Sequence, residues 1–257
     1  MLDLAAGAGT MPATVRKGFD MAKALITWGG WDGHEPDKVA AIFAAILRDA
    51  GADVTVTDSL ACFDDPAPLR EFDLIVPVWT MSKLSREAAV NVSEAVARGT
   101  GLAGCHGGMC DAFRENVLWQ FMTGANWVAH PGGDGVGYRV QIMDHDHELT
   151  AGIVDFDVST EQYYLHVDPA NHVLATTRFP TVPWYHSVNG PVDMPVAWTR
   201  RWGEGRVYYN ALGHKANVIE TGPAHEMLRR GLMWAMAGKA LADPARAEAL
   251  ATKGAHF

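Results

Sequence analysis

A histidine occupies the position where many α/β enzymes place a reactive side chain. Residues 101–111 read Gly-Leu-Ala-Gly-Cys-His-Gly-Gly-Met-Cys-Asp, in which Gly104, His106 and Gly108 fit the pattern Gly-x-nucleophile-x-Gly. This pattern holds a side chain on a sharp turn between a strand and a helix, and its glycines remove steric clashes. The usual central residue is serine or cysteine. Centring the pattern on Cys105 gives a poorer match, so the sequence indicates an imidazole at the tip of this turn. The turn at residues 104–108 is called the corner below.

An imidazole at such a corner favours two kinds of chemistry. Its pKa of about 6.5 allows it to act as a general acid or base at neutral pH. It can instead bind a divalent metal, zinc above all, since zinc prefers nitrogen and carboxylate ligands. The sequence has no compact ligand motif such as His-Glu-x-x-His, so metal ligands would have to come from separate loops. The candidate metal ligands are His34, His106, His130 and His214, with Glu161 as a carboxylate partner.

Three of these side chains are also the candidate catalytic residues, with His106 as acid, base or ligand and Glu161 and His214 supporting it. Taken singly, two of the histidines suit structural roles equally well. His130 precedes a proline in a turn, and His214 follows a predicted hairpin. A functional role for His106, Glu161 and His214 therefore requires that their side chains converge around one pocket in the structure.

The corner belongs to a chain that alternates strands and helices. Short apolar segments predict buried strands, and apolar residues at helical spacing predict amphipathic helices between them. Pro36 suits the first turn of one helix, and Ser85 can cap the next. After the corner, a single helix is expected to carry Phe113, Val117, Leu118 and Phe121. Strands are expected at 23–28, 54–56, 74–78 and 101–105, further helices at 36–50, 85–99 and 224–236, and an antiparallel hairpin at 195–202 and 206–210.

Such alternation implies a mostly parallel sheet with helices on both faces. Loops at the carboxyl ends of parallel strands converge on one crevice, which is the usual ligand site. Aromatic rings in and near these loops suit stacking on sugar rings, although turns that simply cap the sheet are the alternative interpretation. Nucleotide-binding motifs are not found. The candidate substrate-binding residues are Trp28, Trp31, His34, Trp79, Arg114, Tyr164 and Trp184.

The composition narrows the range of partners. The 257 residues carry a formal net charge of -9, and the isoelectric point is about 5.6. This charge argues against nucleic acid and anionic membrane surfaces, which attract clustered Lys and Arg. Cys62, Cys105 and Cys110 are too few for a disulfide framework and fit a reducing, cytoplasmic compartment. The expected partner is a small-molecule sugar, and a homodimer is compatible with the size of the chain.

One α/β domain is expected over residues 21–240. Residues 1–20 are rich in Gly and Ala, lack the pattern of a secretory signal, and are expected to form a disordered extension. Residues 178–194 contain three prolines and are interpreted as a long structured loop of the kind that acts as a lid. Residues 241–257 are rich in Ala and charged residues and are expected to form a C-terminal tail, with a short helix followed by a frayed end.

Several motifs occur in a characteristic order along the chain: 104–108 with 112–114, then 130–131, 161 with 163–164, 195–198, 203–209 and 212–214. Together they resemble the trehalose-utilisation (ThuA-like) family over roughly residues 23–238. This resemblance implies the three-layer, flavodoxin-like α/β fold of class I glutamine amidotransferases, with an antiparallel C-terminal hairpin. It also implies a role in the catabolism of trehalose and related disaccharides, through 3-keto-sugar intermediates.

Three functions are compatible with these observations. The first is a carbohydrate-active hydrolase, lyase or isomerase that acts on a sugar, 3-keto-sugar or keto-glycoside through acid/base or metal-assisted chemistry. The second is a non-catalytic sugar-binding domain on the same scaffold. The third is a Cys-dependent amidohydrolase, which is disfavoured because a glutaminase needs its thiol at the corner. Cys105 lies one residue earlier on a strand and should point to the opposite face.

Overall fold

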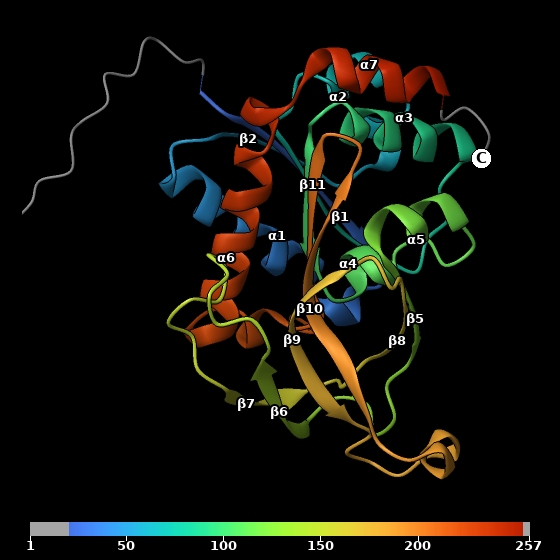
Figure 1. Cartoon of the computed structure of the whole chain (residues 1–257), viewed down its shortest axis with the longest axis vertical. Coiled ribbons are helices and arrows are strands. Elements are labelled where there is room, and N and C mark those ends of the chain that lie inside the picture. Colours follow the sequence, from blue (N-terminus) through green and yellow to red (C-terminus); the bar gives the residue numbers. More distant parts are fainter. Residues whose placement is uncertain (1–20, 254–257) are drawn as a thin grey trace, which may run out of the picture.

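The computed structural model describes residues 21–253, and in this range nine strands form one mixed sheet (Figure 1). Residues 1–20, for which an extension is expected, lie outside the described range. The sheet contains β1 (Lys23–Gly30), β2 (Asp53–Thr57), β3 (Leu74–Thr80), β4 (Gly101–Cys105), β6 (Val136–Ile142), β7 (Phe156–Thr160), β9 (His172–Phe179), β10 (Val192–Trp202) and β11 (Gly205–Asn210). A separate two-stranded sheet contains β5 (Ala125–Ala129) and β8 (Tyr164–Val167).

The large sheet has a parallel half and an antiparallel half. The order of its strands is β2-β1-β3-β4-β11-β10-β9-β6-β7. Neighbours from β2 to β11 run parallel, and neighbours from β11 to β7 run antiparallel. β10 and β11 form the predicted hairpin, in which Trp198 lies opposite Tyr209. The predicted strands are therefore all present, with small differences at their ends.

Helices cover both faces of the sheet, as predicted (Figure 1). They are α1 (Pro36–Asp49), α2 (Pro66–Leu69), α3 (Arg86–Ala97), α4 (Gly107–Cys110), α5 (Val117–Thr123), α6 (Gly222–Ala237) and α7 (Pro244–Lys253), with short 3-10 turns η1 (Asp32–His34), η2 (Leu60–Phe63), η3 (Tyr185–Asn189), η4 (Ala216–Val218) and η5 (Lys239–Leu241). α1 and α6 pack together on one face, where they contact β1, β4 and β11. α3 lies on the other face and contacts α2, α5 and α7. The result is the three-layer arrangement that the sequence predicts.

Local sequence explains where the helices begin and which side they bury. Pro36 is the first residue of α1, and Val39, Phe43 and Leu47 repeat along its buried face. The hydroxyl of Ser85 accepts a hydrogen bond from the N–H of Ala88 at 3.0 Å and caps α3. Helical spacing of apolar residues and a capping hydroxyl are thus sufficient to define these two helices.

The prediction of a single helix after the corner is wrong. The chain forms the short α4, then a turn, and then α5. The side chain of Asn116 starts α5 by accepting a hydrogen bond from the N–H of Trp119 at 2.9 Å. Because α5 begins there, Trp119 is buried, whereas Val117 and Phe121 are exposed. Phe113 is buried in the turn between the two helices.

The residues after Leu241 include α7, which packs beside α3. The link to the β10–β11 turn is Glu204, whose buried carboxylate pairs with Arg246 and accepts a hydrogen bond from the N–H of Asp243 at 3.0 Å. No helix in the described part of the chain has both the length and the apolar character needed to cross a membrane.

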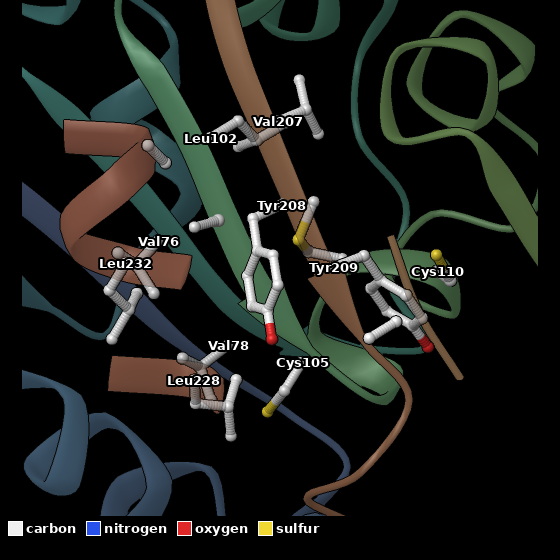
Figure 2. Packing of buried hydrophobic residues seen from close by; sticks show 14 of the residues in the cluster. Val76, Val78, Leu102, Cys105, Cys110, Val207, Tyr208, Tyr209, Leu228 and Leu232 are labelled. Atoms are coloured by element: carbon white, nitrogen blue, oxygen red, sulfur yellow. The ribbon is translucent and has the colours of Figure 1, made fainter. Parts of the chain in front are cut away.

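Two neighbouring tyrosines show how β11 divides the core between the two faces (Figure 2). Tyr208 points toward α6 and Leu228, whereas Tyr209 points to the other face near Cys110. Both tyrosines are fully buried. α6 can approach the sheet closely because Gly231 faces the ring of Tyr208, and a Cβ on this glycine would lie only 2.1 Å from Cε1 of the ring.

Gly231→Ala is therefore expected to destabilise the protein by about 1–3 kcal/mol, the usual cost of overpacking a core. Chemical denaturation measures the effect as the free energy of unfolding. The matched control is Gly137→Ala in β6, where an added Cβ has no neighbour within 4 Å, and the expected change is below about 0.5 kcal/mol. Equal unfolding midpoints for the two variants would show that α6 does not need this close approach.

Candidate metal centre

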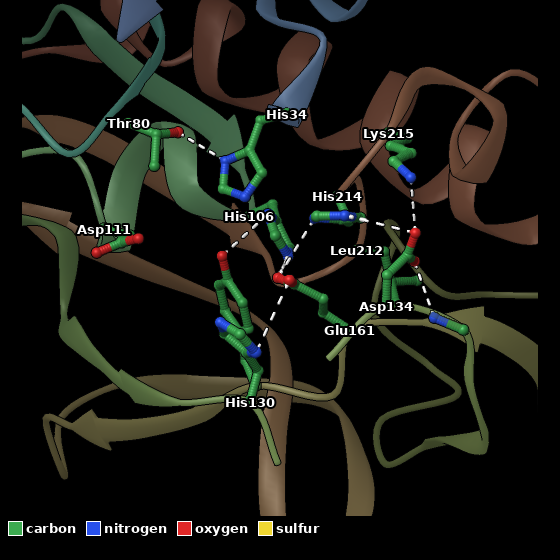
Figure 3. A network of polar contacts seen from close by, with 12 residues as sticks. His34, Thr80, His106, Asp111, His130, Asp134, Glu161, Leu212, His214 and Lys215 are labelled. Carbon is green, nitrogen blue, oxygen red and sulfur yellow. Dashed lines mark hydrogen bonds and ion pairs between the residues drawn. The ribbon is translucent and has the colours of Figure 1, made fainter. Parts of the chain in front are cut away.

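Four side chains from separate parts of the chain converge at one edge of the sheet (Figure 3). His34, His106 and His214 follow β1, β4 and β11, so all three lie at the carboxyl ends of parallel strands. Glu161 comes from the segment between β7 and β8. One ligand atom of each residue lies within 4.8 Å of those of the other three. All four are buried, with exposed fractions from 1% for His106 to 8% for His34.

The backbone at the corner holds His106 in a conformation that few residues other than glycine adopt. Its φ is 48° and its ψ is -134°, between the end of β4 and the start of α4. Such strain persists only where the surroundings enforce it. The N–H of His106 donates to the carbonyl of Asn210 at 2.7 Å, and the hydroxyl of Tyr209 donates to the carbonyl of His106 at 3.1 Å. Gly107 follows, and a Cβ on it would lie 2.6 Å from Cε1 of His34.

Each of the three histidines has one ring nitrogen beside a polar neighbour and the other available to the centre (Figure 3). Polar neighbours of this kind fix the ring orientation and the tautomer of metal-binding histidines. The pairs are His34 Nδ1 with Thr80 Oγ1 at 2.8 Å, His106 Nδ1 with Tyr163 Oη at 3.0 Å, and His214 Nε2 with Asp134 Oδ2 at 3.7 Å.

Three of the atoms that face one another have no hydrogen-bond partner among residues 21–253. Within the described part of the chain, His106 Nε2, His214 Nδ1 and Glu161 Oε2 are buried and unpaired. The carboxylate oxygen lies 3.4 Å from the nitrogen of His106 and 3.3 Å from that of His214. The ligand atoms of a tetrahedral zinc ion, each about 2.0–2.1 Å from the metal, are about 3.3 Å apart. The spacing and the missing partners both fit a metal ion shared by these atoms.

The protonation states of His34, His106 and Glu161 suit the same purpose. Burial, with neighbouring imidazoles for His34, lowers the pKa of His34 to about 2 and the pKa of His106 to about 4. Burial disfavours the charged form of Glu161, but contacts with His106 and His214 outweigh it and hold the pKa of this carboxyl below its usual range. Neutral imidazoles and an ionised carboxylate are the forms that bind metals.

Cys105 is badly placed for thiol catalysis. Its side chain is 3% exposed and lies beside Val78 and Leu228 in the core (Figure 2). Burial raises the pKa of the Cys105 thiol to about 12. A nucleophilic cysteine needs a lowered pKa and an accessible sulfur. The thiol of Cys105 has neither property.

Two other candidate residues lie next to the four grouped side chains. Trp31 is 46% exposed, and its ring packs edge-on to that of His34 with centroids 4.8 Å apart. His130, a candidate metal ligand, has Nδ1 at 3.8 Å from Oε1 of Glu161 and is not one of the four. Trp31 and His130 therefore border the centre without belonging to it.

The remaining candidates for substrate binding lie outside the group of four. The loop around Trp184 covers residues 180–191, shorter than predicted because β9 and β10 extend into both of its ends. Arg114 pairs with Asp111 and stacks over the ring of Trp127, and the indole N–H of Trp79 donates to the hydroxyl of Ser82 at 2.6 Å. Tyr164 packs on the ring of His186. Trp28 is half-buried against the core, and Trp184 is 44% exposed.

The polar neighbours of the three histidines, Thr80, Tyr163 and Asp134, are not among the residues predicted for the site. Tyr164 is the predicted site residue in this segment, but Tyr163 is the one that contacts His106. Residues two apart in an extended segment point to the same side, so alternation from Glu161 favours Tyr163. Thr80 is the last residue of β3 and lies at the same sheet edge as the histidines, so its place at the strand end could have indicated this contact. Asp134 has no comparable signal, because only the tertiary fold brings it to His214.

The chain matches one protein-family model and resembles several solved structures. The family model described as trehalose utilisation, ThuA, matches residues 23–235. A structure from Parabacteroides merdae described as ThuA-like has a TM-score of 0.65 at 18% identity, over 86% of this chain and 91% of its own. A second, from Bacteroides uniformis, has a TM-score of 0.66 at 16% identity, over 87% of this chain and 95% of its own. No curated protein gave a match.

A third solved structure has a similar fold. A structure from Thermoplasma acidophilum described as a component of GMP synthase has a TM-score of 0.53 at 13% identity, over 87% of this chain and 98% of its own. At this identity the likeness concerns the fold alone. The predicted class I glutamine amidotransferase-like fold is therefore confirmed.

The burial of Cys105 predicts that its thiol resists alkylation in the native protein, because the reactive thiolate is suppressed and the sulfur is covered. Native protein is treated with iodoacetamide at neutral pH, and labelled peptides are identified by mass spectrometry. Cys105 should be modified only after denaturation. Rapid labelling of Cys105 in the folded protein would contradict this account and would support a Cys-dependent amidohydrolase.

Proposed function

The chain belongs to the trehalose utilisation (ThuA) family, and from this premise we propose that it is a metal-dependent enzyme of carbohydrate catabolism. The proposed substrate is a 3-keto-sugar or keto-glycoside, whose carbonyl oxygen offers a metal ion a group to polarise. The observation that carries the proposal is the set of buried, unpaired donor atoms on His106, His214 and Glu161. Burying polar atoms without partners costs about 1–3 kcal/mol each, and a simple sugar-binding surface does not require that cost.

The donor set suits zinc or another divalent ion of similar preference. His34 supplies a third imidazole, and because its Nδ1 is bonded to Thr80, its Nε2 is the nitrogen left for the ion. His106 and His214 supply Nε2 and Nδ1, and Glu161 supplies Oε2. Catalytic zinc sites keep one coordination position for water or substrate, sometimes by expanding to five ligands.

When bound, such an ion acts as a Lewis acid on a carbonyl oxygen or lowers the pKa of a bound water. The chain's own residues would orient the reaction. Tyr163 and Thr80 hold the rings of His106 and His34 in place, and burial keeps bulk water from the ligands. The second oxygen of Glu161 lies toward His130, where it can hold or move a proton beside the substrate.

The surroundings of the centre support a sugar as the substrate. Trp31 offers an exposed indole directly beside the ring of His34, and flat apolar rings suit the faces of sugar rings. The side chain of His130 is 37% exposed and adds a polar group at the same border. The three free cysteines, Cys62, Cys105 and Cys110, are compatible with a cytoplasmic location.

The first test is metal binding. After reconstitution with zinc, the purified protein is expected to retain about one ion per chain, measured by inductively coupled plasma mass spectrometry. His106→Ala removes a ligand, so the affinity for zinc should fall by more than about 100-fold. The matched control is His145→Ala, which removes an exposed histidine away from the centre. Equal zinc affinity in the parent and His106→Ala would exclude this metal centre.

The second test is turnover of a keto-sugar. The zinc-loaded protein is incubated with 3-keto-glucosides and the matching unoxidised sugars, and products are followed by mass spectrometry. Glu161→Gln preserves shape but removes charge, so kcat/KM should fall by about 100-fold or more. Trp31→Ala removes a binding surface and should raise KM more than it lowers kcat. Binding of these sugars without turnover by the parent would instead support the non-catalytic sugar-binding function.

A further inference from the structure

Glu35 connects the two turns that carry His34 and His214. It directly follows His34, and its Oε2 accepts a hydrogen bond from the backbone N–H of Ala216 at 3.1 Å. Ala216 is two residues beyond His214 and begins η4. The bonded residues are 181 positions apart in the sequence. The bond is therefore a tertiary link between two loops at the metal centre.

The backbone conformation of Glu35 is unfavourable for glutamate, so the presence of glutamate at this position is explained by what its side chain does. Its φ of 48° and ψ of 50° are left-handed, a region that is unfavourable for residues other than glycine. Glycine would satisfy the backbone more easily. Glycine has no carboxylate, however, and so could not reach the N–H of Ala216. The strained residue at this position is the one that makes the link.

The turn that carries His214 is held from two sides. On one side Asp134 pairs with Lys215 at 2.7 Å, and on the other side Glu35 accepts from Ala216. Ala216 is only 3% exposed, so its N–H depends on a protein partner. The other oxygen of Glu35 pairs with Lys38 at 2.6 Å, which is a contact within α1 and its cap. Only the bond to Ala216 connects the two histidine-bearing turns through this side chain.

We propose that Glu35 is a positioning residue of the metal centre, which sets the separation of His34 and His214 by fixing one turn to the other. The ring centroids of these two histidines are 5.0 Å apart. Metal ligands have to be held within about 0.5 Å of their productive positions. Glu35 acts through the backbone of the two turns and not by coordination. The inference rests on the proposed metal-dependent function and assigns a further residue to that site.

The test compares cobalt(II) binding by the parent, Glu35→Ala, Glu35→Gln and Lys38→Ala. Titration gives the affinity, and the visible absorption of the bound ion reports the geometry of its ligands. Glu35→Ala should bind cobalt about tenfold more weakly or worse, with a changed spectrum at saturation. Glu35→Gln keeps an amide oxygen as acceptor for the N–H of Ala216 and should stay close to the parent. Lys38→Ala leaves the link intact and should match the parent.

Ala216→Pro tests the same bond from the donor side and also serves if Glu35→Ala does not fold. Ala216 is the first residue of a 3-10 turn and Lys215 before it is extended, so proline is tolerated there and removes only the N–H. It should reproduce the weaker binding and the changed spectrum. A parent that binds cobalt, with Glu35→Ala or Ala216→Pro of equal affinity and spectrum, overturns this inference alone. A parent that binds neither cobalt nor zinc overturns the proposed function and this inference with it.

Discussion

The site depends on one electrostatic constraint, namely that three polar atoms with no hydrogen-bond partner among the described residues are buried side by side. A carboxylate in this position is stable only if positive charge or donors surround it. Burial favours the neutral forms of the imidazoles of His34 and His106, so these two rings supply little positive charge to Glu161. A shared cation would satisfy His106, His214 and Glu161 at once. The hydrogen bonds around the centre then have a common purpose, because they prevent the donors from turning away from one another.

The two halves of the sheet make different contributions to this centre. The parallel half brings three histidines together, since β1, β4 and β11 all end at the same edge. The antiparallel half supplies the carboxylate, and the hydroxyl of Tyr138 on β6 donates to the carbonyl of Glu161 at 3.0 Å and fixes its backbone. Tyr163, two residues later, contacts His106 from the same segment. The centre is therefore closed between the two halves, and neither half could form it alone.

The sequence predicts the elements and the histidines better than it predicts their neighbours. Strand ends can be inferred from apolar segments, and parallel strands share an edge, so His34, His106 and His214 could be placed near one another. The helix after the corner was predicted wrongly because its apolar spacing is ambiguous, and the capping bond of Asn116 decides where α5 begins. Asp134 could not be found at all, because its contact with His214 joins positions that share no local pattern.

A shift of one residue explains how an amidotransferase-like scaffold can hold an imidazole centre instead of a thiol. Side chains alternate along β4, so Cys105 enters the core under α6 while the next residue leaves the strand on the left-handed corner. The corner turns the ring of His106 toward the residues that follow β1 and β11. Glycine at 107 leaves room for His34 to approach, where any side chain would collide with that ring. The geometry of the corner thus favours a group of converging imidazoles, and a thiol one position earlier cannot take part in it.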